Sequence, residues 1–318
     1  MRNWMRTATV VGGLCLAGAA SAQVANTPEI EKKLREIGQT FTRETVGQTM
    51  ALYKPLHAAD LPAGITKLAD QVYGPDERNR LDVYLPKGAD GTQPIVTFAH
   101  GGGFVRGDKA EVANVCAWLA SKGIVAVCWS YRFAPKAVYP SGVEDLNHVI
   151  DWIQKNPDLH KGDANHIVIA GNSAGAMHVL DWTLSGQDHA KSGVLGAIVI
   201  SPPTVNLTQA PLDPQRDALY YGADPKALSE RSIINRLDKS TLPMLIAYGE
   251  FDLAQVQDSV RQLANGLYKR DGHMPLLEAV PGHTHISIVE HFGTDDTAFG
   301  DDLVGYVHLL SLRAGQAK

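Results

Sequence analysis

The sequence has few cysteines, no internal repeat and no low-complexity tract, and its Lys and Arg residues form no cluster beyond the first 22 residues. Without a basic cluster, neither nucleic acid nor an anionic membrane surface is a favoured partner. No CxxC or Cys/His pattern indicates a metal site. The 318 residues, 44% of them hydrophobic, are sufficient to bury a large core.

The N-terminal segment 1–22 has the pattern of a secretory signal peptide. Arg2 and Arg6 precede the apolar run TATVVGGLCLAGAA, which is too short to span a bilayer comfortably, and ASA at 20–22 has the form of a cleavage site. We expect an exported protein, periplasmic or secreted, whose mature chain 23–318 has no membrane anchor; the alternative is an uncleaved anchor. Cleavage lowers the Lys and Arg count from 29 to 27 against 34 Asp and Glu, giving a net charge of about −7.

Two cysteines, Cys116 and Cys128, remain after cleavage at that site. An exported protein can form disulfides. However, Cys116 lies in the middle of a predicted helix and Cys128 in the middle of a predicted strand. The spacing between a helix and the sheet below it puts their Cα atoms beyond the reach of a disulfide. We therefore expect two buried free thiols.

Strand and helix patterns alternate along the chain, and this predicts an α/β fold with a mostly parallel central sheet and helices on both faces. Segments 64–74 and 79–86 predict an initial hairpin. The other strands are predicted at 94–100, 124–131, 166–171, 194–201, 243–249 and 275–280, and the helices at 109–123, 141–156, 174–185, 254–270 and 301–315. We expect a single domain over 23–318, in which segments 27–60 and 202–242 form a cap over the carboxyl edge of the sheet.

The motif G-x-S-x-G occupies residues 171–175, between a predicted strand and a predicted helix. A nucleophile on a sharp strand-to-helix turn requires strained backbone angles, and the flanking residues must lack side chains so that strand and helix can approach. Ser173 at the helix N-terminus would lie where developing negative charge is favoured. We interpret Ser173 as a nucleophile; the alternative is a glycine-rich strand end in which Ser173 only caps the helix.

The stretch HGGGF, residues 100–104, follows the third predicted strand. An acyl-transfer enzyme needs backbone N–H donors fixed in advance around the oxyanion, and glycines leave those donors uncovered. We predict an oxyanion hole formed by the amides of Gly102, Gly103 and Ala174. His100 is expected to orient this loop by hydrogen bonding, with a buried histidine of no catalytic role as the alternative.

A serine nucleophile needs a base, and the base needs an orienting acid. In this architecture the acid and then the histidine follow the serine along the chain. Glu250 and Asp252 end one late strand, and His283 and His285 follow another. We favour Asp252 as the acid, because it opens the next helix and can turn toward the sheet edge. We favour His285 as the base and expect His283 to be a loop residue.

Six motifs together resemble the α/β-hydrolase fold, in the esterase branch that contains hormone-sensitive-lipase-like and kynurenine-formamidase-like enzymes of the BD-FAE type. They are HGGGF (100–104), SYRFAP (130–135), YPSGVEDLNHVIDWI (139–153), GNSAGA (171–176), YGEFD (248–252) and GHTHIS (282–287). The resemblance implies Ser173, Asp252 and His285 as a catalytic triad. In formamidase-like members the catalytic histidine directly precedes the pair that matches Ile286 and Ser287, which favours His285. Asn172, where lipase-like members usually carry Asp, points to the formamidase side.

The sequence therefore predicts an exported serine hydrolase that cleaves a small carboxylic ester without a cofactor or metal. An arylformamidase or amidase with the same triad is the alternative enzyme. The alternative of another class is an inactive hydrolase fold used for binding, which usually lacks a triad member. Acyl length, alcohol preference and oligomeric state do not follow from the sequence.

Overall fold

The computed structural model describes residues 26–316 except 188, 190, 210–211 and 298. The predicted signal peptide at 1–22 lies outside the described residues.

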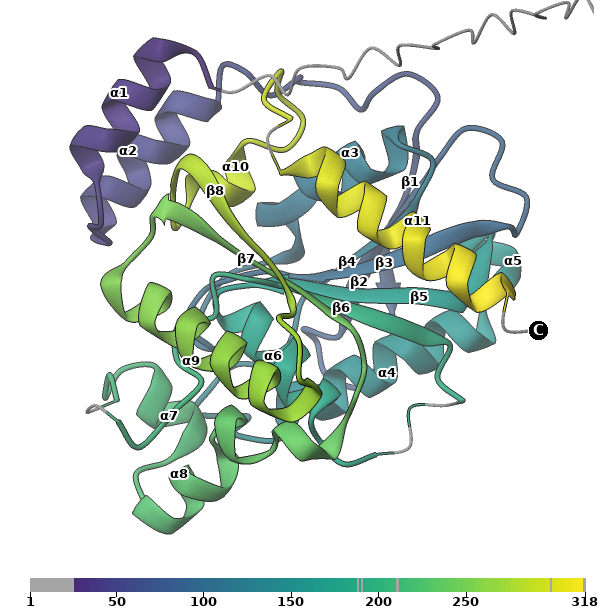
Figure 1. Cartoon of the computed structure of the whole chain (residues 1–318). Coiled ribbons are helices and arrows are strands. Elements are labelled where there is room, and N and C mark those ends of the chain that lie inside the picture. Colours follow the sequence, from purple (N-terminus) through teal and green to yellow (C-terminus); the bar gives the residue numbers. More distant parts are fainter. Residues whose placement is uncertain (1–25, 188, 190, 210–211, 298, 317–318) are drawn as a thin grey trace, which may run out of the picture.

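The core of the structure is one sheet of eight strands in the order β1-β2-β4-β3-β5-β6-β7-β8 (Figure 1). The strands β1–β2 and β2–β4 pair antiparallel, and all the other neighbours pair parallel. The predicted mostly parallel α/β sheet is thereby confirmed, with its initial hairpin. The strands are β1 (Thr66–Val72), β2 (Arg80–Leu85), β3 (Gln93–Ala99), β4 (Val125–Trp129), β5 (Gly162–Asn172), β6 (Val194–Ile200), β7 (Met244–Phe251) and β8 (Leu276–Thr284).

Helices cover both faces of this sheet. On one face lie α3 (Ala113–Ser121), which continues the 3-10 turn η1 (Lys109–Val112), and α11 (Gly300–Gln316). On the other lie α4 (Ser141–Lys155), α6 (Ala174–Thr183) and α9 (Ala254–Asp271), with the one-turn α5 (Pro157–His160) after α4. The alternate residues of β3 therefore enter two different cores, which explains why its sequence is a continuous apolar run.

Two segments stand outside the strand-helix alternation. The first contains α1 (Pro28–Ile37) and α2 (Arg43–Tyr53), which pack beside β8 and α10 (Ser287–Glu290) (Figure 1). The second contains α7 (Asp217–Tyr221), α8 (Pro225–Arg231), η2 (Ile233–Asn235) and η3 (Leu237–Lys239).

A buried carboxylate fastens the second segment to α6. Asp181 on α6 is fully buried; it accepts a 2.7 Å hydrogen bond from the Tyr221 hydroxyl and a 2.5 Å charge-assisted bond from the Arg236 guanidinium. Arg236 also donates to the carbonyl of Arg231. Because a buried charge is tolerated only when it is paired and hydrogen-bonded, these contacts fix the segment beside the sheet edge.

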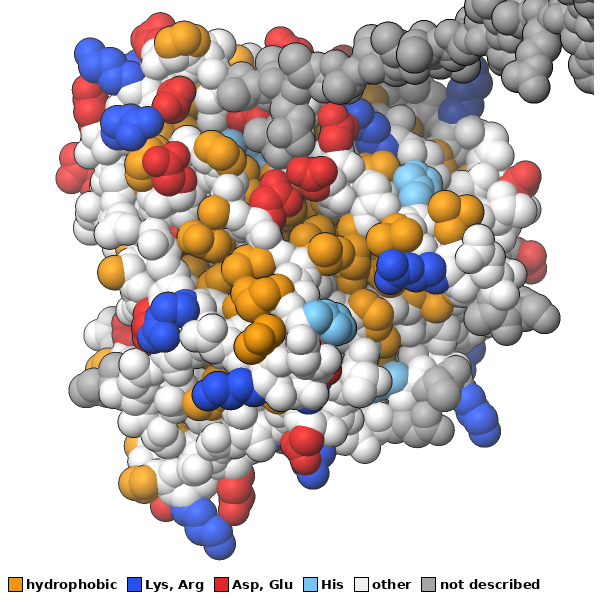
Figure 2. Space-filling view, viewed as in Figure 1, with side chains coloured by type: hydrophobic (Ala, Val, Ile, Leu, Met, Phe, Trp, Pro, Cys, Tyr) orange, Lys and Arg blue, Asp and Glu red, His pale blue; other side chains and the backbone are white. Residues whose placement is uncertain are grey.

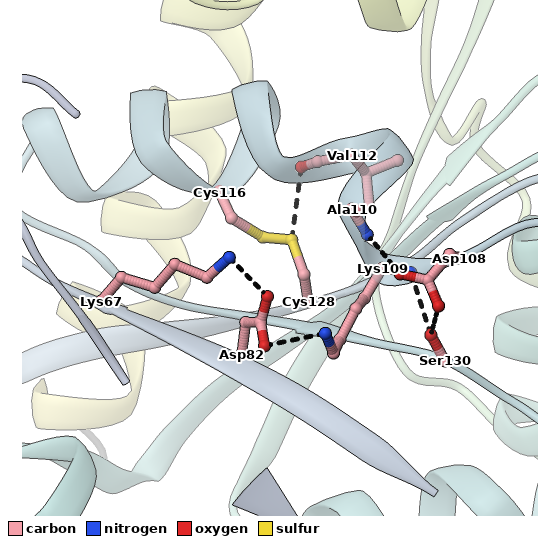
Figure 3. The surroundings of a disulfide bond; sticks show 9 residues. All are labelled: Lys67, Asp82, Asp108, Lys109, Ala110, Val112, Cys116, Cys128 and Ser130. Carbon is pink, nitrogen blue, oxygen red and sulfur yellow. Dashed lines mark hydrogen bonds and ion pairs between the residues drawn. A yellow bond between two sulfur atoms is a disulfide. The ribbon is translucent and has the colours of Figure 1, made fainter. Parts of the chain in front are cut away.

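The prediction of two free thiols is wrong, because Cys116 and Cys128 form a disulfide that joins α3 to β4 (Figure 3). Their Cα atoms are 6.3 Å apart, within the normal range. Cys116 lies on the side of α3 that packs on the sheet, so its Cα is nearer the strand than the helix axis by about the helix radius of 2.3 Å. The spacing of a helix from a sheet therefore overstated the distance between these two residues.

The surface in Figure 2 shows hydrophobic side chains gathered in the middle of the face that α11, β8 and α9 form. The exposed large hydrophobic residues of these three elements are Leu309 and Leu312, Leu276 and Leu277, and Tyr268. No helix among the described residues is both long enough and apolar enough to cross a bilayer.

The disulfide should stabilise the fold by restricting the unfolded chain. For a loop closed over 12 residues we expect about 3 kcal/mol. A reductant should therefore lower the urea midpoint of the wild-type protein and leave that of the double variant Cys116→Ala/Cys128→Ala unchanged. Equal wild-type midpoints with and without reductant would contradict this expectation.

Candidate active site

Ser173 lies in the turn between β5 and α6, with φ of 53° and ψ of −121°. This is a left-handed, strained conformation for a residue with a side chain, and it is held by a 2.9 Å bond from the Ser173 amide to the carbonyl of Ile200. The turn points the hydroxyl away from the strand at the carboxyl edge of the sheet, where ligands bind in α/β folds.

The two glycines of the motif allow this turn because each lies against another backbone. A Cβ on Gly175 would overlap the carbonyl oxygen of Ala99 and lie 2.6 Å from that of His100. A Cβ on Gly171 would lie 2.6 Å from the carbonyl carbon of Gly175. Strand and helix can therefore approach only where both side chains are missing.

His285 bridges Ser173 and Asp252. The Ser173 hydroxyl donates to Nε2 of His285 over 3.0 Å, and Nδ1–H of His285 donates to Oδ1 of Asp252 over 2.8 Å. Asp252 is fully buried and His285 is nearly so. The hydroxyl, imidazole and carboxylate predicted from the sequence thus meet in one chain of hydrogen bonds, with the histidine tautomer set by the carboxylate.

Asp252 is held as an anion by its contacts. Burial raises the pKa of its carboxyl, but the His285 imidazole, the Ser201 hydroxyl at 2.5 Å and the Leu253 amide at 2.8 Å outweigh burial and bring the pKa below its usual value. Glu250, the other candidate, is exposed and accepts a hydrogen bond from the amide of Gly282 instead.

Two neighbours of these three side chains were not expected from the sequence. Ser201 directly follows the apolar strand β6, which is the neighbour of β7 in the sheet. A polar residue at the end of an apolar strand is a pattern that could have identified it. Phe41 lies between α1 and α2, and its ring meets the His285 ring edge to face at 5.2 Å. No pattern in the sequence connects Phe41 with a histidine more than two hundred residues away.

The glycine loop lies beside Ser173. Gly102 and Gly103 have φ of 126° and 61°, and Phe104 also has a positive φ of 68°, with its buried ring stacked on Tyr220 at 4.6 Å. Within the described part of the chain, the amides of Gly102, Gly103 and Ala174 donate to no other backbone group. Amides that lack a backbone acceptor and lie close to a serine hydroxyl are the donors that an oxyanion on that serine would require.

His100 lies beneath this loop, fully buried, and its ring stacks on Tyr131 at 4.3 Å. Its Nδ1–H donates to the carbonyl of Gly101 over 2.5 Å, while Nε2 has no partner among the described residues. Burial lowers the pKa of His100 to about 4, so the ring is neutral at neutral pH. These contacts are those of a group that orients the loop.

His283 is not the loop residue expected from the sequence. It lies at the end of β8, fully buried, with Nε2 3.1 Å from Oδ2 of Asp296 and Nδ1 3.1 Å from the Ser287 hydroxyl. Ser287 in turn accepts the amide of Thr284, one residue before His285. His283 therefore belongs to the buried network that supports the turn carrying His285, and its ring does not reach Ser173.

A cavity of about 230 Å³, called here the Ser173 cavity, opens at this point. Phe41 from the first outlying segment lines it, and Pro203, Arg216 and Asp217 from the second do so as well. Those three residues and Gln255 also line a groove of about 780 Å³, whose walls carry the side-chain amides of Asn206, Gln209, Gln215 and Gln262. No group of three or more His, Cys, Asp or Glu side chains within the described ranges could hold a metal ion.

The chain has the α/β-hydrolase fold. Its structure superposes on that of esterase B from Lactobacillus rhamnosis with a TM-score of 0.72, over 92% of this chain and 99% of that one, at 18% sequence identity. Residues 81–194 match the BD-FAE family model. The resemblance expected from the sequence motifs is confirmed by these matches.

Curated relatives are esterases and a formamidase. The chain is 39% identical to isoprenylcysteine alpha-carbonyl methylesterase of Arabidopsis thaliana over 116 residues, 36% of this chain and 27% of that protein. The chain thus spans little more than a quarter of the length of this and similar plant methylesterases. It is 24% identical to kynurenine formamidase of Salmo salar over 70% of this chain and 76% of that protein.

The close approach at Gly175 predicts that Gly175→Ala strongly destabilises the protein. The added Cβ would overlap backbone that cannot move without separating β3 from α6, so we expect the free energy of unfolding in urea to fall by at least about 2 kcal/mol. Gly305→Ala on α11 is the matched control, because its Cβ meets nothing within 4 Å and alanine favours helix. Equal stability of the two variants would contradict the close approach.

Proposed function

We propose that this protein is a serine hydrolase that cleaves small carboxylic esters through Ser173, His285 and Asp252. The observation that carries the proposal is the bridge through His285, with hydrogen bonds of 3.0 and 2.8 Å, next to three amides that donate to no backbone group among the described residues. The esterases among the relatives and the structural neighbours support it.

In the first half of the reaction, Ser173 Oγ attacks the ester carbonyl while its proton passes to His285 Nε2. Asp252 stabilises the imidazolium through Nδ1–H. The carbonyl oxygen becomes an oxyanion and accepts hydrogen bonds from the amides of Gly102, Gly103 and Ala174. When the intermediate collapses, the proton on Nε2 goes to the leaving alcohol and the acyl group stays on Ser173.

In the second half, water attacks the acyl carbonyl and gives its proton to His285. The same amides stabilise the second oxyanion, and Ser173 leaves with the proton from Nε2. The carboxylic acid is released and the site returns to its starting state. Every proton is passed by one imidazole, so the reaction requires no group beyond the chain and water.

The dimensions of the site favour a short acyl group. The Ser173 cavity of about 230 Å³ is smaller than most ligand pockets, whereas the adjoining groove of about 780 Å³ has room for a larger portion of the substrate. The half of the substrate that enters the groove meets several side-chain amides and is therefore polar.

An arylformamidase is the second candidate, favoured by the similarity to kynurenine formamidase over most of the chain. It would use the same three side chains. An amine leaving group depends more on protonation by His285 than an alcohol does, so the ratio of the two rates discriminates the candidates.

Ser173→Ala should reduce hydrolysis of 4-nitrophenyl acetate by at least about 10⁴-fold, because the nucleophile is lost. Ser311→Ala on α11, which removes a hydroxyl outside the Ser173 cavity, is the matched control and should retain wild-type kcat/KM. An aryl formamide measured beside the ester should be cleaved more slowly by the wild type. Retained activity in Ser173→Ala would exclude the proposed nucleophile, and faster cleavage of the formamide would favour the second candidate.

We also propose that the protein is exported and cleaved after residue 22. The disulfide between Cys116 and Cys128 supports this, because such bonds persist in oxidising compartments and are rare in the cytosol. N-terminal sequencing of the protein from the periplasm or medium of an expressing bacterium should give Gln23 as the first residue. Recovery only from the cytosol, with an intact N-terminus, would contradict export.

A further inference from the structure

Two arginines border the Ser173 cavity, and the proposed reaction uses neither. Arg106 follows the glycine loop, and Arg216 immediately precedes α7. Both line the same cavity as Ser173 and His285.

The stems of these arginines lie against the two glycines of the proposed oxyanion hole. Cγ of Arg106 is 3.4 Å from the position that a Cβ on Gly102 would occupy, and Cδ of Arg216 is 2.7 Å from the corresponding position at Gly103. Both side chains therefore pack on the loop that would hold the reacting oxygen.

The two arginines differ in their ion pairs. Nε of Arg216 lies 2.9 Å from Oδ2 of Asp213, so that side chain is paired. Arg106 is exposed and has no ion pair and no side-chain hydrogen bond within the part of the chain that the structure describes. A cation with no partner at the mouth of a small cavity can bind an anion.

Two acids lie near Arg106. Asp217 lines the same cavity, and Glu111 is close enough for the Arg106 charge to act on its carboxyl. Burial raises the pKa of Asp217 and of Glu111, which favours their neutral forms over those of ordinary surface acids. Among the described residues that line the cavity, the formal charges of Arg106, Arg216 and Asp217 sum to +1, in a chain whose formal net charge is −5.

We propose that Arg106 binds a carboxylate on the substrate, so that the preferred substrates are esters with a negative charge near the bond that is cleaved. This inference rests on the proposed function, since it names the substrate class of the same site. A guanidinium matches a carboxylate with two parallel hydrogen bonds, and Arg106 is an exposed arginine that lines the cavity.

Two pairs of esters test the assignment and locate the charge. 4-Nitrophenyl hemisuccinate against 4-nitrophenyl butyrate compares a carboxylate with a methyl group on the acyl side. 3-Acetoxybenzoate against phenyl acetate makes the comparison on the alcohol side. Each ester is measured with the wild type, with Arg106→Gln, which keeps the Cβ and Cγ that pack on Gly102, and with Arg313→Gln on α11, which changes the net charge equally away from the cavity.

In at least one pair, Arg106→Gln should lower the ratio of kcat/KM for the anionic over the neutral ester about two- to fivefold, the effect of an exposed ion pair. Arg313→Gln should leave that ratio at the wild-type value. Added NaCl should lower the ratio in the wild type and not in Arg106→Gln. Equal ratios in the wild type and Arg106→Gln for both pairs would overturn the assignment. Failure of the wild type to cleave any of the four esters would overturn the proposed function and this inference with it.

Discussion

The arrangement of the site depends on two hydrogen bonds to one imidazole. His285 is 112 residues from Ser173 and 33 from Asp252, and it contacts both only because β5, β7 and β8 end at the same edge of one sheet. Parallel strands bring their carboxyl ends together whatever their separation along the chain. The sheet order therefore decides that these three side chains meet, and the local turns decide how they point.

Glycine is the second constraint, and it acts differently at the two places where it matters. At Gly171 and Gly175 a side chain would collide with backbone, so the requirement is space for β3, β5 and α6 to meet. In the loop after β3 the requirement is also conformational, because Gly102 and Gly103 take positive φ angles, which favour glycine. Both requirements concern the backbone immediately around Ser173.

The sheet, its helices and the convergence of Ser173, Asp252 and His285 could be predicted because each follows from local patterns: apolar runs, helical spacing, and polar residues at strand ends. The disulfide could not, since it depends on the distance between one side of α3 and β4, which general spacings do not give. The burial of His283 was missed for a similar reason. Its partner Asp296 lies beyond α10, a helix of one turn that has no clear signature in the sequence. Phe41 and Arg216 reach the cavity from segments outside the strand-helix alternation, whose packing depends on long-range contacts.

The most direct test of the central claim is a crystal structure of the protein after reaction with a phosphonate ester, whose tetrahedral phosphorus imitates the intermediate of ester hydrolysis. The account predicts a single covalent bond from phosphorus to Ser173 Oγ, with the phosphoryl oxygen within hydrogen-bonding distance of the amides of Gly102, Gly103 and Ala174 and with His285 still bonded to Asp252. A phosphonate attached to another side chain, or one whose oxygen points away from those amides, would contradict it.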